Sequence, residues 1–415
     1  MSRSSVQFRY AMLAAANFSA GVMGFLTTTI IGSHFGPGGL GDVALATSVL
    51  AYALIIATGG TELYAIQKVA AAPETLDRMV SSVIVVRLGL GVLCYATLVI
   101  IAALAYPDRW TIIALFGLSL LPAALNTSWV PQALHESGVF ALANVLTQAV
   151  SISLLWLTIK SSGGLTAVAG SKILAELLIA GGLILWLRRF GRKLERPLPW
   201  KDLRRLALDC MPIASTQLVR GFALGTDLVI LAFFVSRDET GYFAAAFKIF
   251  AFMLGLGTAY FVILLPKIAQ QPDNVAMARE LGASFKLVLP TATIAAGGIA
   301  LAATPLLRTL FGPTFGAAAT ALQLLCLAWL ANIMGRHYRQ VLLARECRGS
   351  DFRLSLASCG VHLGSRLILI PFLGITGAAL GMLLGELYLL IAQRHVCRRE
   401  LARPNSAAAT APAIP

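Results

Sequence analysis

Residues 212–266 read PIASTQLVRGFALGTDLVILAFFVSRDETGYFAAAFKIFAFMLGLGTAYFVILLP. This stretch contains two apolar runs, each long enough to cross a bilayer, joined by a polar turn at residues 237–241. It therefore predicts a transmembrane hairpin. Arg220, Asp227 and Lys248 lie inside the apolar runs, where a charge costs roughly 2.5 to 3.5 kcal/mol on insertion scales. We expect these side chains to face a polar interior, and Arg220 and Asp227, about two helical turns apart, to point the same way.

The composition of the whole chain excludes an ordinary soluble protein. Hydrophobic residues make up 58% of it, charged residues only 13%, and the mean hydropathy is +0.79, whereas soluble domains contain about 45–50% apolar residues. A polytopic membrane protein is therefore predicted. The net charge of +14 would also suit nucleic acid, but basic residues in membrane proteins usually mark the cytoplasmic loops. We expect no nucleic-acid partner.

Apolar runs along the chain predict about twelve membrane-spanning helices and an all-α fold. The expected bounds are 10–33, 41–67, 79–104, 110–130, 139–159, 165–187, 206–235, 241–266, 285–307, 316–336, 354–372 and 376–393. The first run is longer than the apolar core of a signal peptide, so we interpret it as an uncleaved helix.

The longest basic segment divides these helices into two sets of six. We expect an N-lobe at 1–187, a basic cytoplasmic linker at 188–205, a C-lobe at 206–398 and a disordered cytoplasmic tail at 399–415. Shifting the sequence on itself by 200 residues matches Gly41 with Gly241, which suggests an internal repeat. Repeats of six helices share one orientation, so we expect two lobes around a central cavity, as in other parallel-repeat transporters.

Cations inside the spans point to an anionic substrate. A cavity lined by unbalanced cations suits an anion, and the planar guanidinium of arginine suits phosphate oxygens. The expected substrate-binding residues are Arg220, Lys248, Arg366, Arg87 and Lys172. Arg220 is the strongest candidate, because no acidic residue lies three or four positions from it.

Carboxylates inside the spans are candidates for ion coupling. They are Asp227, Glu176, Glu386 and Glu62. Desolvation favours the neutral form of a buried carboxyl group, so one of them could carry a proton during transport. Structural roles remain open as well. Glu176 lies four residues after Lys172 and could pair with it, and Glu62 and Arg87 could be interfacial or paired.

The sequence carries no sign of an enzyme, a cofactor or a metal centre. The five histidines are dispersed, and neither a His-Glu-x-x-His nor a Gly-x-Ser-x-Gly motif nor a phosphate-binding Gly-Lys-Thr loop occurs. The six cysteines are scattered without a Cys-x-x-Cys pair. We therefore expect neither a zinc site nor a disulfide framework, and any driving energy must come from gradients or from the flow of the substrate.

Three stretches resemble the Wzx-type O-antigen flippases, the polysaccharide-transporter branch of the multidrug/oligosaccharidyl-lipid/polysaccharide (MOP) exporter superfamily. They are FLTTTIIGSHFGPGGLGDVALATSV at 25–49, DLVILAFFVSRDETGYFAAAFKIF at 227–250 and VILLPKIAQ at 262–270. The resemblance implies a fold like that of the multidrug (MATE) transporters, with two six-helix lobes around a V-shaped cavity. It also implies flipping of an undecaprenyl-pyrophosphate-linked oligosaccharide across the bacterial inner membrane for O-antigen, capsule or exopolysaccharide synthesis. Lipid II flippases usually add two further helices, which favours such a repeat unit as the cargo here.

Two other functions remain open at this point. A MATE-type drug or cation antiporter would share the fold but should depend on carboxylates more than on arginine and lysine. A polytopic polymerase or ligase would normally carry a large outer loop, and the expected outer turns are short. The expected partners are the lipid-linked oligosaccharide and membrane lipids, and a polysaccharide polymerase and a chain-length regulator are open as further partners.

The distribution of basic residues predicts that both termini and the 188–205 segment lie in the cytoplasm. With this orientation the inner segments hold about 24 Lys and Arg and the outer turns about 4. A membrane-impermeant thiol reagent added outside intact cells should label Asp238→Cys but not Lys193→Cys, each introduced into a cysteine-free background. Labelling that reached position 193 and missed 238 would reverse the topology.

Overall fold

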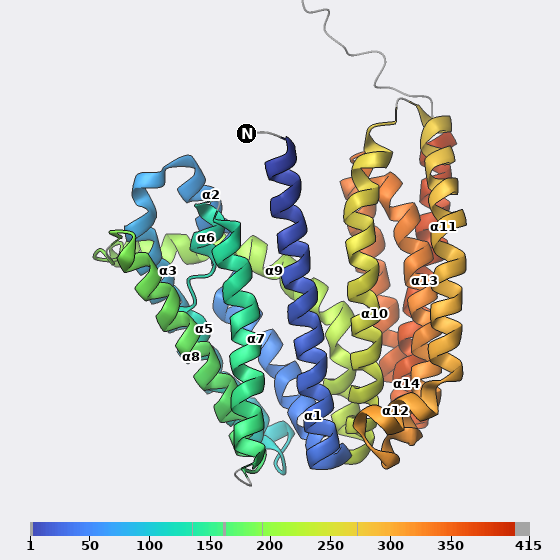
Figure 1. Ribbon diagram of the computed structural model, residues 1–415, viewed down its shortest axis with the longest axis horizontal. Helices are drawn as coiled ribbons and strands as arrows, with labels where there is room; N and C mark the ends of the chain where they lie inside the picture. The colour runs from blue at the N-terminus through green and yellow to red at the C-terminus, as the bar shows by residue number, and fades with distance from the viewer. Residues whose placement is uncertain (1–2, 135, 161–162, 193, 272, 403–415) are drawn as a thin grey trace, which may run out of the picture. The chain divides into compact units, whose positions relative to one another are not determined.

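The computed structural model describes residues 3–134, 136–160, 163–192, 194–271 and 273–402. Side chains are described within these ranges except at residues 3–17, 137, 219–220, 223–224, 258–259, 262 and 348. The described chain is helical and contains no strand, which confirms the all-α fold (Figure 1).

The α-helices follow one another with short connections. They are α1 (Arg3–Thr58), α2 (Thr61–Ala71), α3 (Leu76–Ala105), α4 (Trp110–Gly117), α5 (Leu120–Leu125), α6 (Trp129–Ala133), α7 (Ser137–Lys160), α8 (Leu165–Arg189), α9 (Trp200–Phe234), α10 (Arg237–Ala269), α11 (Asn274–Leu301), α12 (Ala303–Phe311), α13 (Ala319–Ala344) and α14 (Arg348–Ala402). Two short 3₁₀ helices lie at Pro73–Thr75 and Pro313–Ala318.

Nine segments of the described chain are long and apolar enough to cross a membrane, so the protein is a multi-pass membrane protein. Two of these segments, Phe18–Ala71 and Gly349–Ala402, are 54 residues long. Each contains a glycine with positive φ inside its long helix, Gly36 with φ 68° in α1 and Gly374 with φ 53° in α14. Glycine adopts this left-handed backbone without steric cost, so each segment holds two of the expected spans joined by a sharp bend.

Several helix bounds differ from those expected, for local reasons. The expected span at 110–130 is divided into α4, α5 and α6, and the chain leaves the helix at Asn126. Helix α11 begins earlier than expected, at Asn274, because the Asp273 carboxylate caps it by accepting a hydrogen bond from the Ala276 N–H at 2.7 Å. Helix α9 likewise begins at Trp200, so only the middle of the expected basic linker lacks helical structure.

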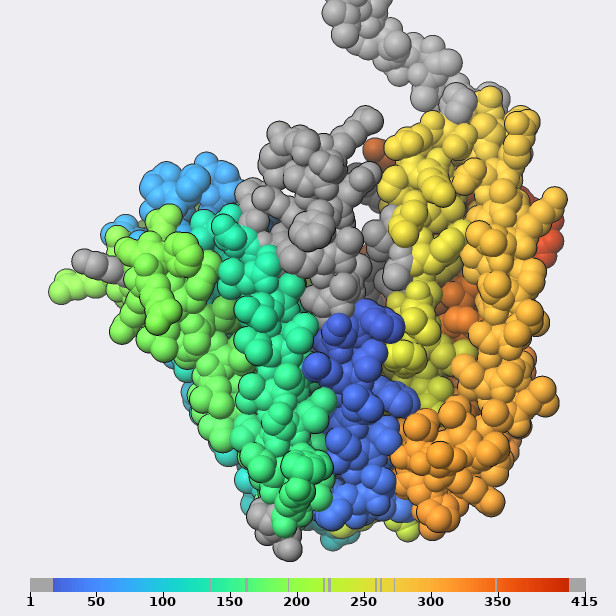
Figure 2. Space-filling view, in the orientation of Figure 1, coloured from blue at the N-terminus to red at the C-terminus, as the bar shows by residue number. Residues whose placement is uncertain are grey.

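The chain forms two compact units, Met1–Ala244 and Ala245–Pro415. In the first, α1 packs against α3, α4, α7 and α9, and α7 packs against α8. Figure 2 shows α1, α7 and α8 side by side on one face of this unit. In the second, α13 packs against both α11 and α14. The expected lobe boundary at 188–205 stays a prediction, and most of the expected tail, residues 403–415, lies outside the described range.

One end of the first unit is held together by charged groups in its turns. Arg109 Nε lies 3.6 Å from Asp42 Oδ1, and Arg237 Nη1 lies 3.4 Å from Asp42 Oδ2. Arg237 also donates a hydrogen bond of 2.6 Å from Nη2 to the Asp108 carbonyl oxygen. The bend after Gly36, the α3–α4 turn and the α9–α10 turn are therefore linked through one carboxylate.

The two glycines that the repeat matches lie against each other. A Cβ atom on Gly41 would stand 2.9 Å from the Gly241 nitrogen and would overlap the Arg237 carbonyl oxygen. A Cβ atom on Gly241 would overlap the Pro37 carbonyl oxygen. The second part of α1 and the first turn of α10 thus touch backbone to backbone, which only glycine allows.

Gly241→Ala should destabilise the protein by about 1–3 kcal/mol, because the added methyl group forces two backbones apart. Gly297→Ala is the matched control, since a Cβ atom there meets nothing within 4 Å, and it should be neutral or stabilise the helix by up to about 1 kcal/mol. Thermal unfolding of both variants in detergent measures the difference. Equal midpoints would show that the Gly41–Gly241 contact does not need glycine.

Candidate functional site

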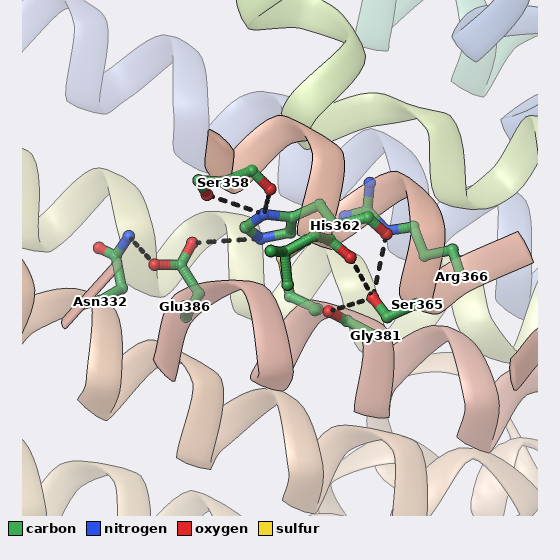
Figure 3. A network of polar contacts seen from close by, with 9 residues as sticks. Asn332, Ser358, His362, Ser365, Arg366, Gly381 and Glu386 are labelled. Atoms are coloured by element: carbon green, nitrogen blue, oxygen red, sulfur yellow. Dashed lines mark hydrogen bonds and ion pairs between the residues drawn. The ribbon is translucent and has the colours of Figure 1, made fainter. Parts of the chain in front are cut away.

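A buried polar cluster lies inside the second unit, between α13 and the two parts of α14 (Figure 3). It contains Asn332 on α13, His362 before the bend at Gly374, and Glu386 after it. His362 and Glu386 are each 2% exposed. All three lie in membrane-spanning segments, where polar groups are costly and usually functional.

The hydrogen bonds of the cluster fix the orientation of its side chains. Asn332 Nδ2 donates to Glu386 Oε2 at 3.0 Å. His362 Nδ1 lies 2.9 Å from the Ser358 carbonyl oxygen, an acceptor, so this nitrogen carries the hydrogen. His362 Nε2 has no hydrogen-bond partner among the described residues and lies 3.9 Å from Glu386 Oε1. In the neutral imidazole Nε2 is an acceptor that faces a carboxylate oxygen, and one proton on either group would make this contact attractive.

Two small residues on the second part of α14 make room for this arrangement. A Cβ atom on Gly385 would overlap the His362 ring, so the ring packs directly on the helix backbone beside Glu386. Gly381 accepts a hydrogen bond from Ser365 Oγ at 3.3 Å through its carbonyl oxygen. The two parts of α14 can therefore approach closely enough for His362 to meet Glu386 (Figure 3).

Two arginines supply positive charge beside the cluster. Arg366 lies one helical turn after His362, is 0% exposed, and donates from Nη2 to Met382 Sδ at 3.6 Å. Arg336 on α13 and Arg366 both interact electrostatically with Glu386. A carboxylate in this setting can neutralise the arginines or hold a proton, and the choice depends on the charge of His362.

The first unit contains a second buried cluster, around Arg87. Arg87 is 3% exposed, donates from Nε to Thr61 Oγ1 at 2.7 Å and from Nη1 to the Asn126 carbonyl oxygen at 3.0 Å. Glu62 lies beside it and accepts from Gln132 Nε2 at 3.3 Å. Two of the residues expected from the sequence, Arg87 and Glu62, are thus brought together.

The other expected residues are found in separate places. Lys172 Nζ and Glu176 Oε1 form an ion pair of 2.5 Å on α8, as their spacing allows. Asp227 is 1% exposed on α9, and Lys248 is partly buried on α10. Arg220 lies in α9, but its side chain is outside the described part of the structure, so its direction relative to Asp227 stays a prediction.

His362 is the residue that the sequence did not single out. His362 could have been recognised as a titratable ring inside the apolar run 354–372. It was missed because only Lys, Arg, Asp and Glu were counted as charged residues in the spans. Asn332 was one of the polar positions in the expected spans that could bind a sugar hydroxyl or bond helix to helix, and the second role is the commoner one. Ser358 gave no signal. Within the described part of the chain, no group of three or more His, Cys, Asp or Glu could hold a metal ion.

Comparison with known families decides the assignment of the chain. The family of polysaccharide biosynthesis proteins matches residues 10–271. The chain belongs to this family. The match confirms the resemblance carried by residues 25–49, 227–250 and 262–270, all of which lie inside it. Comparison with curated proteins gave no significant match.

Solved structures show which fold this member of the family adopts. An inward-facing multidrug resistance MATE family transporter of the MOP superfamily is 17% identical with a TM-score of 0.72, covering 92% of this chain and 94% of that one. The lipid II flippase MurJ, in an inward closed conformation, is 15% identical with a TM-score of 0.72, covering 94% and 90%. A MOP superfamily transporter from Pyrococcus furiosus is 15% identical with a TM-score of 0.56, covering 95% of both chains. The fold is therefore that of MOP transporters.

Glu386→Ala should destabilise the protein by about 1–3 kcal/mol, because it leaves the buried amide of Asn332 without its acceptor. Glu386→Gln keeps an acceptor oxygen and should cost less. Glu280→Gln on α11 is the control, since Glu280 is only partly buried and outside the cluster. A double-mutant cycle with Asn332→Ala, followed by thermal unfolding, measures the coupling, and strictly additive effects would contradict the bond.

Proposed function

We propose that this protein flips an undecaprenyl-pyrophosphate-linked oligosaccharide from the inner to the outer leaflet of the bacterial inner membrane, for O-antigen, capsule or exopolysaccharide synthesis. The observation that carries the proposal is the match to polysaccharide biosynthesis proteins over residues 10–271. Its support is the fold, which is similar to that of a protein described as a lipid II flippase. The proposed orientation places both termini in the cytoplasm.

The proposed contacts with the substrate are made through its phosphates. A diphosphate carries negative charge into the membrane, and cations inside the spans can offset the loss of its hydration. The structure buries Arg366 completely and Arg87 almost completely, and Lys248 partly. Arg220 and Lys172 complete the proposed set. Lys172 is the weakest member, because its ion pair with Glu176 already uses its charge.

The proposed coupling ion is a proton, with the carboxylates Glu386, Asp227, Glu176 and Glu62 as its candidate sites. Glu386 has the most support, because it faces an acceptor nitrogen of His362 in a buried cluster. Glu176 has the least, since it already forms an ion pair with Lys172. A polysaccharide polymerase and a chain-length regulator are the further partners that we propose.

A second candidate function is MATE-type antiport of drugs or cations. It is favoured by the fold similarity to a multidrug MATE transporter, which has the same TM-score as the similarity to MurJ. The two functions differ in cargo and are separable in cells. The test is to express this protein in a strain that lacks its own flippase. If the protein is a flippase, the strain should regain surface polysaccharide. If it is an antiporter, drug tolerance should rise and the polysaccharide defect should stay unchanged.

Arg220→Ala should abolish or sharply reduce surface polysaccharide in that strain, because each lost charge-assisted bond to phosphate costs roughly 1.5–3 kcal/mol of binding. Arg220→Lys should restore export only in part, since an ammonium keeps the charge and loses the planar fork. Arg279→Ala, exposed on α11, is the control. Membrane protein levels are measured in parallel.

Two outcomes would remove the phosphate role from Arg220. The first is full export by Arg220→Ala at native expression. The second is recovery of export in the Arg220→Ala, Asp227→Ala double variant when each single variant fails, which would show that Arg220 only neutralises a neighbouring carboxylate.

A further inference from the structure

The second expected transmembrane span, residues 41–67 in the first unit, is interrupted at two consecutive glycines. Gly59 and Gly60 have φ values of 56° and 68°, so α1 ends at Thr58 and α2 begins at Thr61. No side chain caps the start of α2. The free N–H groups and the dipole of a helix give its N-terminus a partial positive charge, which favours an anion.

Arg87 brings a full positive charge to the same point. Its Nε atom donates to the hydroxyl of Thr61, the first residue of α2, at 2.7 Å. Its Nη1 atom donates to the Asn126 carbonyl oxygen at 3.0 Å. The third nitrogen, Nη2, is buried and has no hydrogen-bond partner among the described residues. A side chain that is only 3% exposed thus keeps an unused donor at the end of a helix.

No neighbouring carboxylate forms a close ion pair with Arg87. Within the described ranges, no Asp or Glu oxygen lies within 4.0 Å of an Arg87 nitrogen. Glu62 attracts Arg87 from further away while it accepts a hydrogen bond from Gln132. Leaving a buried guanidinium donor unused is costly, so the arrangement is that of a site prepared for a further acceptor.

We propose that the helix-break site, formed by Gly60, Thr61, Glu62 and Arg87, binds a phosphate group of a lipid. A phosphate oxygen would accept from Arg87 Nη2 while the group lies at the start of α2. Gly60 is required because a Cβ atom there would stand 2.8 Å from two carbon atoms of Ile213 on α9. Glu62 and Gln132 beside the site are only partly buried. Glu62 repels the same phosphate, so ligand entry requires this carboxylate to move away.

Two lipids could supply the phosphate. One is the diphosphate of the lipid-linked substrate, and this source rests on the proposed function. The other is the headgroup of an anionic phospholipid of the surrounding membrane, which would bind whether or not the protein flips a sugar lipid.

Native mass spectrometry of the purified full-length protein can test the site. The probes are undecaprenyl diphosphate, phosphatidylglycerol and, as a phosphate-free control, undecaprenol. Arg87→Gln should weaken binding of the recognised phosphate lipid about ten- to hundredfold, the range of one charge-assisted hydrogen bond, and leave undecaprenol unchanged. Arg78→Gln, exposed on the same helix, should leave all three unchanged. Glu62→Gln should tighten binding, because it removes the competing charge.

The results distinguish the two lipid sources of the phosphate from a purely structural role of Arg87. Loss confined to undecaprenyl diphosphate identifies the substrate as the ligand, and loss confined to phosphatidylglycerol identifies a membrane phospholipid. Unchanged binding of both lipids in Arg87→Gln and Glu62→Gln would overturn the proposal and leave Arg87 a structural residue. If Arg87→Gln does not fold, Arg87→Lys, which keeps the charge and loses the fork, and Glu62→Gln decide the question.

The proposed flippase function fails independently of this site. Absence of surface polysaccharide in cells that express the wild-type protein, with Arg87-dependent lipid binding intact, would contradict the function and leave the site standing. Normal export with no Arg87-dependent lipid binding would contradict the site and leave the flippase function standing.

Discussion

The hydrocarbon interior of a bilayer offers no hydrogen-bond partner to a backbone amide, and helices satisfy their amides internally. The described chain obeys this constraint almost everywhere, and several of its departures within long apolar stretches occur at glycines with positive φ. Gly36 and Gly374 each bend one long helix, α1 and α14, and Gly59 with Gly60 separates α1 from α2. Glycine is needed at these points because other residues would pay for the left-handed backbone in steric strain.

The same absence of water governs the charged side chains. Lys172 is offset by Glu176 on its own helix, and Glu386 by the amide of Asn332 and the nearby arginines. Pairs of this kind are costly to break whether or not they have a function. Functional significance is better sought where pairing is incomplete. Among the buried side-chain atoms of the described chain that lack a hydrogen-bond partner are His362 Nε2 beside Glu386 and Arg87 Nη2 beside Thr61.

Both incomplete clusters lie at interruptions of the helical pattern. His362 and Glu386 belong to the two parts of α14, which meet because Gly374 bends the helix and Gly385 leaves space for the ring. Arg87 lies at the gap between α1 and α2. A bend or gap provides what a continuous helix cannot, namely exposed backbone groups and a close approach of two helix faces. The helical scaffold is shared by drug transporters and a lipid II flippase, so the cargo must be decided by such polar sites and not by the fold.

The sequence by itself determined the membrane class, the helical architecture and the family resemblance, because apolar length and the positions of Lys and Arg are properties of the chain taken residue by residue. It also placed Lys172 and Glu176 together, since an i, i+4 spacing brings two side chains to one face of a helix. It could not place the ends of α9 and α11, where capping and helix continuation depend on local backbone geometry. Only the tertiary structure joined His362 to Glu386 across a bend, and Arg87 to Thr61 across a gap. These partners lie on different helices or on the two parts of one bent helix, and their meeting depends on glycines whose role becomes visible only when the neighbouring helix is in place.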